Sequence, residues 1–304
     1  MSDRILALDI GGTKIAAALV DDDGTLTGRR ERPTPSGDAE TVWAAVEALL
    51  AGVRADAAVR AVGVSSAGPV DASTGTVSPI NIAGWNGFPI VERIAAATGL
   101  PVHLGGDGLC MALGEQWRGA GRGARFLLGM VVSTGIGGGL VLDGAPYPGR
   151  TGNAGHVGHV VVKMGGAPCT CGGHGCAETV ASGPNLARWA RDHGWRAPAH
   201  ANAKELAEAA RAGDPVALRA FGRGADAVAA TIASVGAVCD LDLAVVGGGV
   251  AKAGALLFDP LHEALRRYAG LSFLRGLEVV PAELGGDAGL VGAAALVGAS
   301  TRFG

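Results

Sequence analysis

The stretch Asp9-Ile10-Gly11-Gly12-Thr13-Lys14 ends an apolar run that begins at Ile5, and a second apolar run follows from Ile15 to Val20. This order predicts a strand, a tight glycine turn and a second strand. The two glycines let backbone approach phosphate oxygens closely, and an acid at a strand end can hold Mg²⁺ directly or through water. The stretch therefore indicates either a magnesium nucleotide site or an ordinary hairpin turn.

Two further glycine-rich turns follow apolar runs later in the chain. The segment Ser133-Thr134-Gly135-Ile136-Gly137-Gly138-Gly139 lies between runs at 126–133 and 139–142 and adds a hydroxyl pair. Gly247-Gly248-Gly249 follows a run at 243–246, where a purine or ribose could lie against bare backbone. Two matched loops favour phosphate binding over a chance turn. The Walker-A pattern is absent, which excludes a P-loop enzyme.

Expected strands and helices alternate along the chain, which predicts an α/β fold. Strands are expected at 5–9, 15–20, 61–65, 102–104, 126–133, 139–142, 243–246 and 277–280, and helices at 39–53, 90–98, 109–117, over most of 180–238 and at 289–297. The simplest architecture has two α/β lobes, each opened by a glycine-turned hairpin, with the phosphate loops facing a shared cleft. We expect the small lobe to comprise residues 1–118 plus 289–304, and the large lobe residues 119–288.

Composition excludes several classes of protein. The 304 residues are 48% hydrophobic and 17% charged, which indicates a globular chain rather than a disordered one. A net charge of −3 offers no basic stripe, so we expect no nucleic acid partner. No apolar run approaches the about 20 residues of a membrane helix, and Met1 to Asp9 contains no export signal. We expect a cytoplasmic protein.

Three of the five cysteines, Cys169, Cys171 and Cys176, fall within eight positions. In a reducing compartment such spacing favours metal binding over disulfides. The alternative is three free cysteines in a loop.

Taken in order, these segments resemble the bacterial ROK family (repressors, open reading frames, kinases). The resemblance rests on Asp9 to Lys14, then Asp107, then Ser133 to Gly139, then Cys169-Thr170-Cys171-Gly172-Gly173-His174-Gly175-Cys176-Ala177-Glu178, then Gly247 to Gly249. It covers nearly the whole chain, and Cys-x-Cys-Gly-x-x-Gly-Cys-x-Glu is its most specific part. It implies the two-lobed actin-like ATPase fold shared by sugar kinases, Hsp70 and actin, with a cleft between the lobes.

The resemblance implies an ATP-dependent kinase that phosphorylates a hexose hydroxyl, most often the 6-hydroxyl of glucose. Asp107 would be the general base, because a carboxylate within reach of the attacking hydroxyl can orient it and accept its proton. The alternative role for Asp107 is a helix N-cap. Nucleotide and Mg²⁺ would be bound by Asp9, Gly11, Gly12, Thr13, Lys14, Thr134, Gly135, Gly247, Gly248 and Gly249.

By the same resemblance, His159 joins Cys169, Cys171 and Cys176 as ligands of Zn²⁺. A closed Cys₃His tetrahedron is a structural site, so its role would be to fix the loop that carries Glu178. The sugar would contact Gly68, Asn81, Gly106, His156, His159 and Glu178.

Two positions depart from the family pattern. The pair Asn-Asp before the catalytic helix is Gly106-Asp107 here, and Glu-x-Gly-His is His156-Val157-Gly158-His159. Both missing groups contact ring hydroxyls of the hexose in the family, whereas the base and the zinc ligands are kept. We therefore expect intact catalysis with altered recognition, and a glucose-derived amino sugar such as 3-amino-3-deoxyglucose (kanosamine) becomes a candidate beside glucose.

Three other functions must be weighed: a sugar sensor, a DNA-binding repressor and a kinase that uses polyphosphate. A catalytically weak sugar-sensing or partner-binding protein is the main alternative, but it would not need Asp9, Asp107 and both phosphate loops. The repressors of the family carry a DNA-binding domain before the first loop, and we expect none here because the loop begins at Asp9. A polyphosphate donor is not excluded by the sequence, although the Gly247 to Gly249 turn favours ATP. The family also implies a homodimer or homotetramer.

Overall fold

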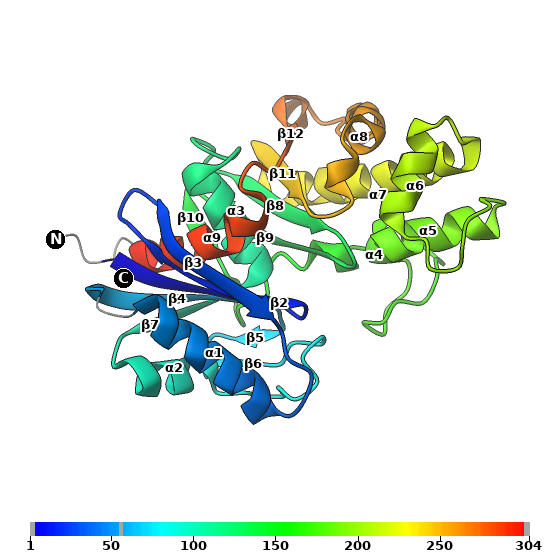
Figure 1. Cartoon of the computed structure of the whole chain (residues 1–304). Helices are drawn as coiled ribbons and strands as arrows, with labels where there is room; N and C mark the ends of the chain where they lie inside the picture. The colour runs from blue at the N-terminus through cyan, green and yellow to red at the C-terminus, as the bar shows by residue number, and fades with distance from the viewer. Residues whose placement is uncertain (1–3, 55–56, 301–304) are drawn as a thin grey trace. The chain divides into compact units, whose positions relative to one another are not determined.

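The computed structural model describes residues 4–54 and 57–300, in which strands and helices alternate as expected (Figure 1). The strands are β1 (Arg4–Ile10), β2 (Lys14–Val20), β3 (Leu26–Pro33), β4 (Val59–Ser66), β5 (Val70–Asp71), β6 (Thr76–Val77), β7 (Val102–Gly106), β8 (Leu127–Val132), β9 (Ile136–Leu142), β10 (Ala145–Tyr147), β11 (Leu243–Gly247) and β12 (Glu278–Pro281). The helices are α1 (Ala39–Arg54), α2 (Ile90–Thr98), α3 (Asp107–Arg118), α4 (Glu178–Ala181), α5 (Gly183–Asp192), α6 (Ala203–Arg211), α7 (Pro215–Cys239), α8 (Ala255–Tyr268) and α9 (Ala288–Ser300), with 3₁₀ helices η1 (Val157–His159), η2 (Ala251–Ala253), η3 (Ser272–Gly276) and η4 (Gly285–Asp287).

The hairpin predicted at the start of the chain is confirmed. β1 and β2 pair antiparallel with Ile10 opposite Ile15, and the Gly11 N–H donates to the Lys14 carbonyl at 3.0 Å to close the turn. Both strands are buried along nearly their whole length, so both of their faces are covered. Burial on both faces explains why their sequences are continuous apolar runs rather than alternating ones.

The first sheet has the order β3-β2-β1-β4-β7, in which β4 runs parallel to β1 and β7 parallel to β4. Figure 1 shows α1 and α2 on one face of this sheet and α3 and α9 on the opposite face. Val46 and Leu50 of α1 belong to one buried cluster with Leu6 and Leu8 of β1. The helices therefore cover both faces, as an α/β sheet requires.

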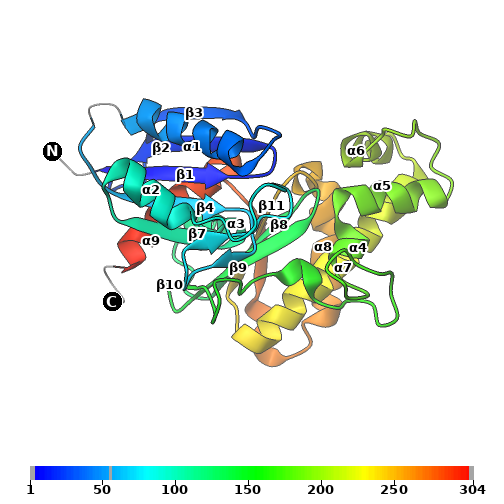
Figure 2. The ribbon, with the colours of Figure 1, turned by 90° about the horizontal axis from the view of Figure 1, so that it is seen from below.

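The second sheet has the order β10-β9-β8-β11-β12, and its strands β8, β11 and β12 run parallel. Figure 2 shows the long helix α7 beside α8. Two helices within the helical stretch expected at 180–238 have clear starts: Pro184 lies in the first turn of α5, and Asp214 caps α7 by accepting hydrogen bonds from Val216 N (2.8 Å) and Ala217 N (2.9 Å).

The chain divides into two compact units. Unit 1 comprises the described residues of Met1–Arg125, Gly139–Gly155 and Glu283–Gly304, and unit 2 comprises Phe126–Gly138 and His156–Ala282. The expected lobes had assigned residues 119–125, 139–155 and 283–288 to the second lobe, whereas these residues lie in unit 1. One reason is Asn153, whose side chain accepts from Val70 N at 3.1 Å and donates to Val70 O at 2.8 Å.

A buried carboxylate explains why the segment before α9 belongs to unit 1. Glu115 of α3 is fully buried, and its side chain accepts hydrogen bonds from the backbone N–H groups of Ala120 (2.9 Å), Glu283 (3.1 Å) and Leu284 (2.8 Å). A carboxylate satisfied by several backbone donors is a stable arrangement inside a protein. Glu115 thus holds the start of the connection to α9 against the end of α3.

Among the helices of residues 4–54 and 57–300, none combines the length and apolar character that crossing a membrane requires.

Candidate active site

Two acidic residues lie at the carboxyl edge of the first sheet. Asp9 is opposite Ser65 in the β1–β4 pair, and Ser65 is opposite Gly105 in the β4–β7 pair. Asp107 follows two residues later as the first residue of α3. Because neighbouring strands lie about 4.8 Å apart, two strand spacings separate the backbone of Asp9 from that of β7 by about 10 Å. Both carboxylates thus belong to the same edge of the sheet, and the charge of Asp107 acts on Asp9.

The Asp9 carboxylate is held from two sides. The buried Ser65 hydroxyl donates to Asp9 Oδ1 at 2.6 Å. A Cβ atom at Gly289, in the first turn of α9, would lie 2.7 Å from the Asp9 carboxyl carbon, so the helix begins directly against this carboxylate. Burial raises the pKa of Asp9, and the charge of Asp107 adds to this effect, whereas the Ser65 hydrogen bond and the charge of Lys14 oppose it. A cation beside Asp9 would favour its ionised form.

Asp107 is exposed, and its Oδ1 accepts a hydrogen bond from the Gly108 N–H at 2.7 Å. The residue before it, Gly106, occupies the N-cap position of α3 with extended backbone, so the N-cap role considered for Asp107 is wrong. A Cβ atom at Gly106 would meet no atom within 4 Å. The position therefore has open space beside the Asp107 carboxylate.

The first glycine turn is packed against a loop of the same unit. The Thr34 hydroxyl donates to Gly11 O at 2.6 Å, which fixes the turn. A Cβ atom at Gly12 would lie 2.6 Å from the Cβ atom of Asn81, so the Asn81 side chain lies over the turn. Ile80 N donates to Gly68 O at 3.4 Å and joins this loop to Gly68. Unit 1 thus brings Gly12, Gly68 and Asn81 together.

The second glycine turn and the third line one cavity in unit 2. Ser133 N donates to Gly135 O at 2.9 Å, and Gly183 N donates to Ser133 O at 2.8 Å. Gly248, at φ +95°, lies so close to Val132 O that a side chain there would overlap it. The cavity has a volume of about 340 Å³ and is lined by Ser133, Thr134, Gly183, Pro184, Asn202, Ala203, Lys204, Gly249 and Val250. Its volume lies within the range of small-molecule sites.

Glu178 and the two predicted histidines lie near the same turn. Glu178 Oε2 accepts a hydrogen bond from Ile136 N at 2.8 Å. Gly158, between the histidines, packs directly against Ile136 O, where a Cβ atom would overlap. The rings of His156 and His159 stack with centroids 6.4 Å apart. Unit 2 therefore gathers Glu178, His156 and His159, whereas Gly106 and Asp107 belong to unit 1.

The candidate metal ligands His159, Cys169, Cys171 and Cys176 form one cluster, in which one ligand atom from each lies within 4.8 Å of all the others. Cys171 Sγ and Cys176 Sγ are 3.7 Å apart, and Cys169 Sγ and His159 Nδ1 are 3.8 Å apart. Zinc–sulfur bonds of about 2.3 Å at tetrahedral angles place two sulfurs about 3.8 Å apart. The donor set and its spacing therefore fit Zn²⁺.

The environments of two of these thiols differ. The backbone N–H of Gly173 donates to Cys171 Sγ at 3.4 Å, and this hydrogen bond lowers the pKa of Cys171. Burial, followed by contacts with the neighbouring thiols, raises the pKa of Cys176 to about 12. A bound cation reverses such a rise, because a coordinating thiol is deprotonated by the metal.

The comparison with known families supplies the decisive match: the model of the ROK family fits residues 5–300. The chain belongs to the ROK family. It is 36% identical to glucokinase from Thermotoga maritima over 310 residues, which cover 97% of each chain. It is also 36% identical over 295 residues to N-acetylmannosamine kinase from Yersinia pseudotuberculosis, with 95% of this chain and 96% of that protein covered.

Solved ROK structures confirm the predicted fold class. The ROK hexokinase from Thermus thermophilus superposes with a TM-score of 0.88 at 37% identity, over 99% of this chain and all of the hexokinase. The ROK glucokinase from Streptomyces griseus, in complex with glucose and AMPPNP, superposes with a TM-score of 0.82 at 36% identity and 96% coverage of this chain and 98% of that one. These neighbours have the actin-like ATPase fold, and this ROK chain shares it.

Part of the cavity in the ROK chain was not predicted from sequence. Pro184, Asn202, Ala203, Lys204 and Val250 line it beside the predicted Thr134 and Gly249. Asn202 caps α6, accepting from Lys204 N at 2.8 Å while Glu205 accepts from Asn202 N at 2.8 Å. An Asn followed three positions later by Glu signals a helix N-terminus. That signal predicts where α6 begins. It does not predict that the first residues of α6 line a cavity.

Proposed function

We propose that this ROK chain transfers the γ-phosphoryl group of ATP to a hydroxyl group of a hexose. Glucokinases and N-acetylmannosamine kinases match it over nearly its whole length, and both are sugar kinases. The observation that carries the proposal is the placement of exposed Asp107 at the same sheet edge as Asp9. Asp107 would bind the attacking hydroxyl, and Asp9 would face the phosphates of ATP. Phosphoryl transfer requires this division of roles.

Asp107 acts as the general base in this mechanism. Its carboxylate orients the sugar hydroxyl and accepts its proton as the new oxygen–phosphorus bond forms. The bond between the γ-phosphorus and its bridging oxygen breaks at the same centre, and ADP leaves with that electron pair. The exposure of Asp107 supports this role, because a base must reach its substrate within hydrogen-bond distance.

The 340 Å³ cavity of unit 2 would take the adenosine part of ATP, with Thr134 and Gly249 against it. Lys204 lines this cavity and would contact the ribose or a phosphate. Asp9 offers the anionic oxygen that Mg²⁺ prefers, and Ser65 and the start of α9 hold it in place. When bound, Mg²⁺ would neutralise charge on the phosphates.

We expect Gly289→Ala to raise the KM for Mg-ATP or lower kcat, by about 10- to 100-fold in kcat/KM. The new methyl group would lie 2.7 Å from the Asp9 carboxyl carbon and force this carboxylate to move, and small displacements of catalytic groups are costly. Gly298→Ala in the same helix is the matched control, because its Cβ would meet nothing within 4 Å. Steady-state kinetics of both variants test the role of Asp9, and equal kinetics would contradict it.

We also propose that His159, Cys169, Cys171 and Cys176 bind one Zn²⁺, which supplies a structural cross-link and no open coordination position. Only Ala177 separates Cys176 from Glu178, so a fixed Cys176 fixes the start of α4. His159 also follows closely on His156. The metal cluster would thereby position the sugar-binding side chains of unit 2.

We propose that the acceptor is the 6-hydroxyl of glucose or of a glucose-derived amino sugar such as kanosamine. Gly106 and His156 stand where the ROK pattern has Asn and Glu, so one amide and one carboxylate are missing from the sugar contacts. Open space at Gly106 supports a pocket that accommodates a changed ring substituent. Gly68, Asn81, His159 and Glu178 keep the remaining polar contacts of the glucokinase-like pattern.

Release of ADP from Mg-ATP in the presence of single sugars tests this proposal. The panel is glucose, glucosamine, kanosamine, mannose, N-acetylmannosamine, fructose and a reaction without sugar. Turnover with glucose or with an amino sugar supports the proposal, and the preferred sugar identifies the acceptor. Absence of turnover with every sugar would contradict it and would favour the sugar-sensing alternative. Replacing ATP by polyphosphate in the same assay tests the donor.

Gly106→Asn is expected to shift preference toward glucose by about 10-fold in kcat/KM relative to kanosamine. The backbone of Gly106 (φ −65°, ψ 150°) is accessible to any residue, and its surroundings leave room for the side chain. One restored hydrogen bond to a ring hydroxyl contributes about 1.4 kcal/mol, which corresponds to this factor. Gly106→Ala fills space without the amide and serves as control. An unchanged preference in Gly106→Asn would remove position 106 from sugar selection.

We further propose that the protein acts in the cytoplasm as a homodimer or homotetramer, as its ROK relationship implies. Light scattering coupled to size-exclusion chromatography would determine the number of subunits, and a monomer at micromolar concentration would contradict the proposal.

A further inference from the structure

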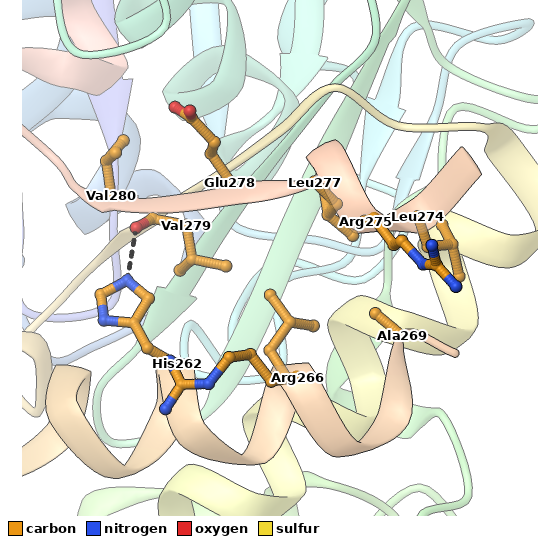
Figure 3. A pocket seen from close by; sticks show the side chains of 10 residues that line it. His262, Arg266, Ala269, Leu274, Arg275, Leu277, Glu278, Val279 and Val280 are labelled. Atoms are coloured by element: carbon orange, nitrogen blue, oxygen red, sulfur yellow. Dashed lines mark hydrogen bonds between the residues drawn. The ribbon is translucent and has the colours of Figure 1, made fainter. Parts of the chain in front are cut away.

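A second cavity in unit 2 lies between α8 and the segment formed by η3 and β12 (Figure 3). Its volume is about 570 Å³, within the range of about 300–1,000 Å³ that small-molecule sites occupy. Its apolar walls are the buried side chains of Leu265, Leu274, Leu277 and Val279. None of its lining residues lines the nucleotide cavity described above. The proposed kinase reaction therefore leaves this cavity without a role.

Two arginines line the cavity without a counter-ion. Within residues 4–54 and 57–300, neither Arg266 nor Arg275 forms an ion pair or a side-chain hydrogen bond. Figure 3 shows the Arg275 guanidinium at the η3 end of the cavity and the Arg266 guanidinium over α8 near His262, with the carboxylate of Glu278 directed away from α8. Arg267, the next residue along α8, instead pairs with Asp226 at 2.6 Å and Glu263 at 3.5 Å. Both arginines are exposed and line the cavity, so each can offer an unpaired positive charge to a ligand at its opening.

A backbone donor of the sheet edge is also available. β12 is the edge strand of its sheet, and Val279, only 5% exposed, directs its carbonyl toward α8, where His262 Nε2 donates to it at 2.9 Å. In a strand, the N–H of a residue points to the same side as its C=O. Glu278 N donates to Asp242 O and Ala282 N to Val246 O on the β11 side, so the alternate residue Val279 points its N–H away from β11. Edge strands present such donors outside the ladder of the sheet, where a ligand can accept from them.

We propose that the cavity between α8 and β12 binds a small organic anion with an apolar body. The apolar walls take the body, and the carboxylate, phosphate or sulfonate group accepts hydrogen bonds from Arg266 or Arg275 and from the Val279 N–H. An apolar pocket with a few polar groups at its wall is the usual form of a small-molecule site. Guanidinium groups suit planar and tetrahedral anions alike.

The test is a fluorescence titration of the full-length protein with anilinonaphthalene sulfonate, which combines an aromatic body with one anionic group. Wild type is expected to bind it at one saturable site. The double variant Arg266→Ala/Arg275→Ala is expected to bind at least about 10-fold more weakly, because charge-assisted hydrogen bonds are lost. Arg267→Ala is the matched control: it removes a cation from the same helix, but one that is already paired, and its affinity should equal that of wild type.

Two further measurements locate the probe. Ala269→Trp places a large side chain in the cavity and is expected to abolish binding, while kinase activity and melting temperature report that each variant is folded. Saturating AMPPNP is expected to leave the bound fluorescence unchanged, since the nucleotide cavity has different lining residues. Equal affinities in wild type and the double arginine variant, displacement by AMPPNP, or no saturable binding would each overturn the proposal.

Discussion

Asp107→Ala is expected to lower kcat for sugar phosphorylation by about 10²- to 10⁴-fold, the range that a positioned general base contributes. Without the carboxylate, the attacking hydroxyl must lose its proton to water while it is poorly oriented. The side chain is exposed and makes a local hydrogen bond to Gly108 N, so its removal should leave folding nearly unchanged. Single-turnover kinetics with Mg-ATP and the preferred sugar would measure the loss in the chemical step.

The variant Asp107→Asn keeps the shape of the side chain but removes its ability to accept a proton. The amide oxygen of asparagine can still accept the Gly108 N–H, yet the side chain cannot take a proton at neutral pH. The asparagine variant should therefore be as slow as the alanine variant, with unchanged metal content and melting temperature. If Asp107→Asn keeps more than about a tenth of wild-type turnover, Asp107 is not the base and another carboxylate must be sought. Asp9 would be the first to test, because it lies at the same sheet edge.

The parts of the site that could be predicted from sequence are those whose chemistry is local. An acid, two glycines and a threonine between two apolar runs define a turn by themselves, and the structure shows that turn between β1 and β2. The cluster of three cysteines and a histidine is gathered by a short loop, which the distances now show. Short-range backbone geometry decides the turn and the spacing of the three cysteines, so both are visible in the local sequence, whereas His159 was predicted only from the resemblance to the ROK family.

Residues whose role depends on contacts between distant parts of the chain could not be predicted from the sequence. Ser65 lies in an apolar run that reads as a buried strand, and only the register of β4 against β1 places its hydroxyl on Asp9. Glu115 is part of a helical segment, where a glutamate usually indicates a solvent-facing position, yet it is fully buried. Its partners Glu283 and Leu284 are more than 160 residues away along the chain. Such long-range contacts cannot be inferred from local pattern.

The strand β3 was missed for a different reason. Its sequence, Leu-Thr-Gly-Arg-Arg-Glu-Arg-Pro, has no apolar alternation, and most of its residues are exposed. β3 is the edge strand of the first sheet, and charged residues on an edge prevent pairing with another chain. The pattern that protects the edge also removes the hydrophobic signal of a strand.

Cys171→Ser is expected to reduce bound zinc to well below one ion per chain and to lower the melting temperature by several degrees. Serine replaces a thiolate by a poor zinc ligand, and the three remaining ligands no longer close the tetrahedron. Each kcal/mol shifts the melting temperature by about 2–4 °C in chains of about 150–250 residues and by somewhat less in longer ones, so a loss of about 2–3 kcal/mol lowers it by several degrees. Elemental analysis of purified protein and a thermal melt measure the two effects.

Cys239→Ser is the matched control, because Cys239 ends α7 and does not belong to the His159–Cys176 cluster. Its zinc content should equal that of wild type. The kinetic consequence of Cys171→Ser should fall mainly on the KM of the sugar, since the cluster supports His159 and Glu178, while Asp107 in unit 1 remains in place. Wild-type protein that contains no zinc and is fully active would refute the structural role. If Cys171→Ser instead raises only the KM for ATP, the metal cluster acts on the Ser133–Gly135 turn. Glu178 lies beside this turn, because it accepts a hydrogen bond from Ile136 N.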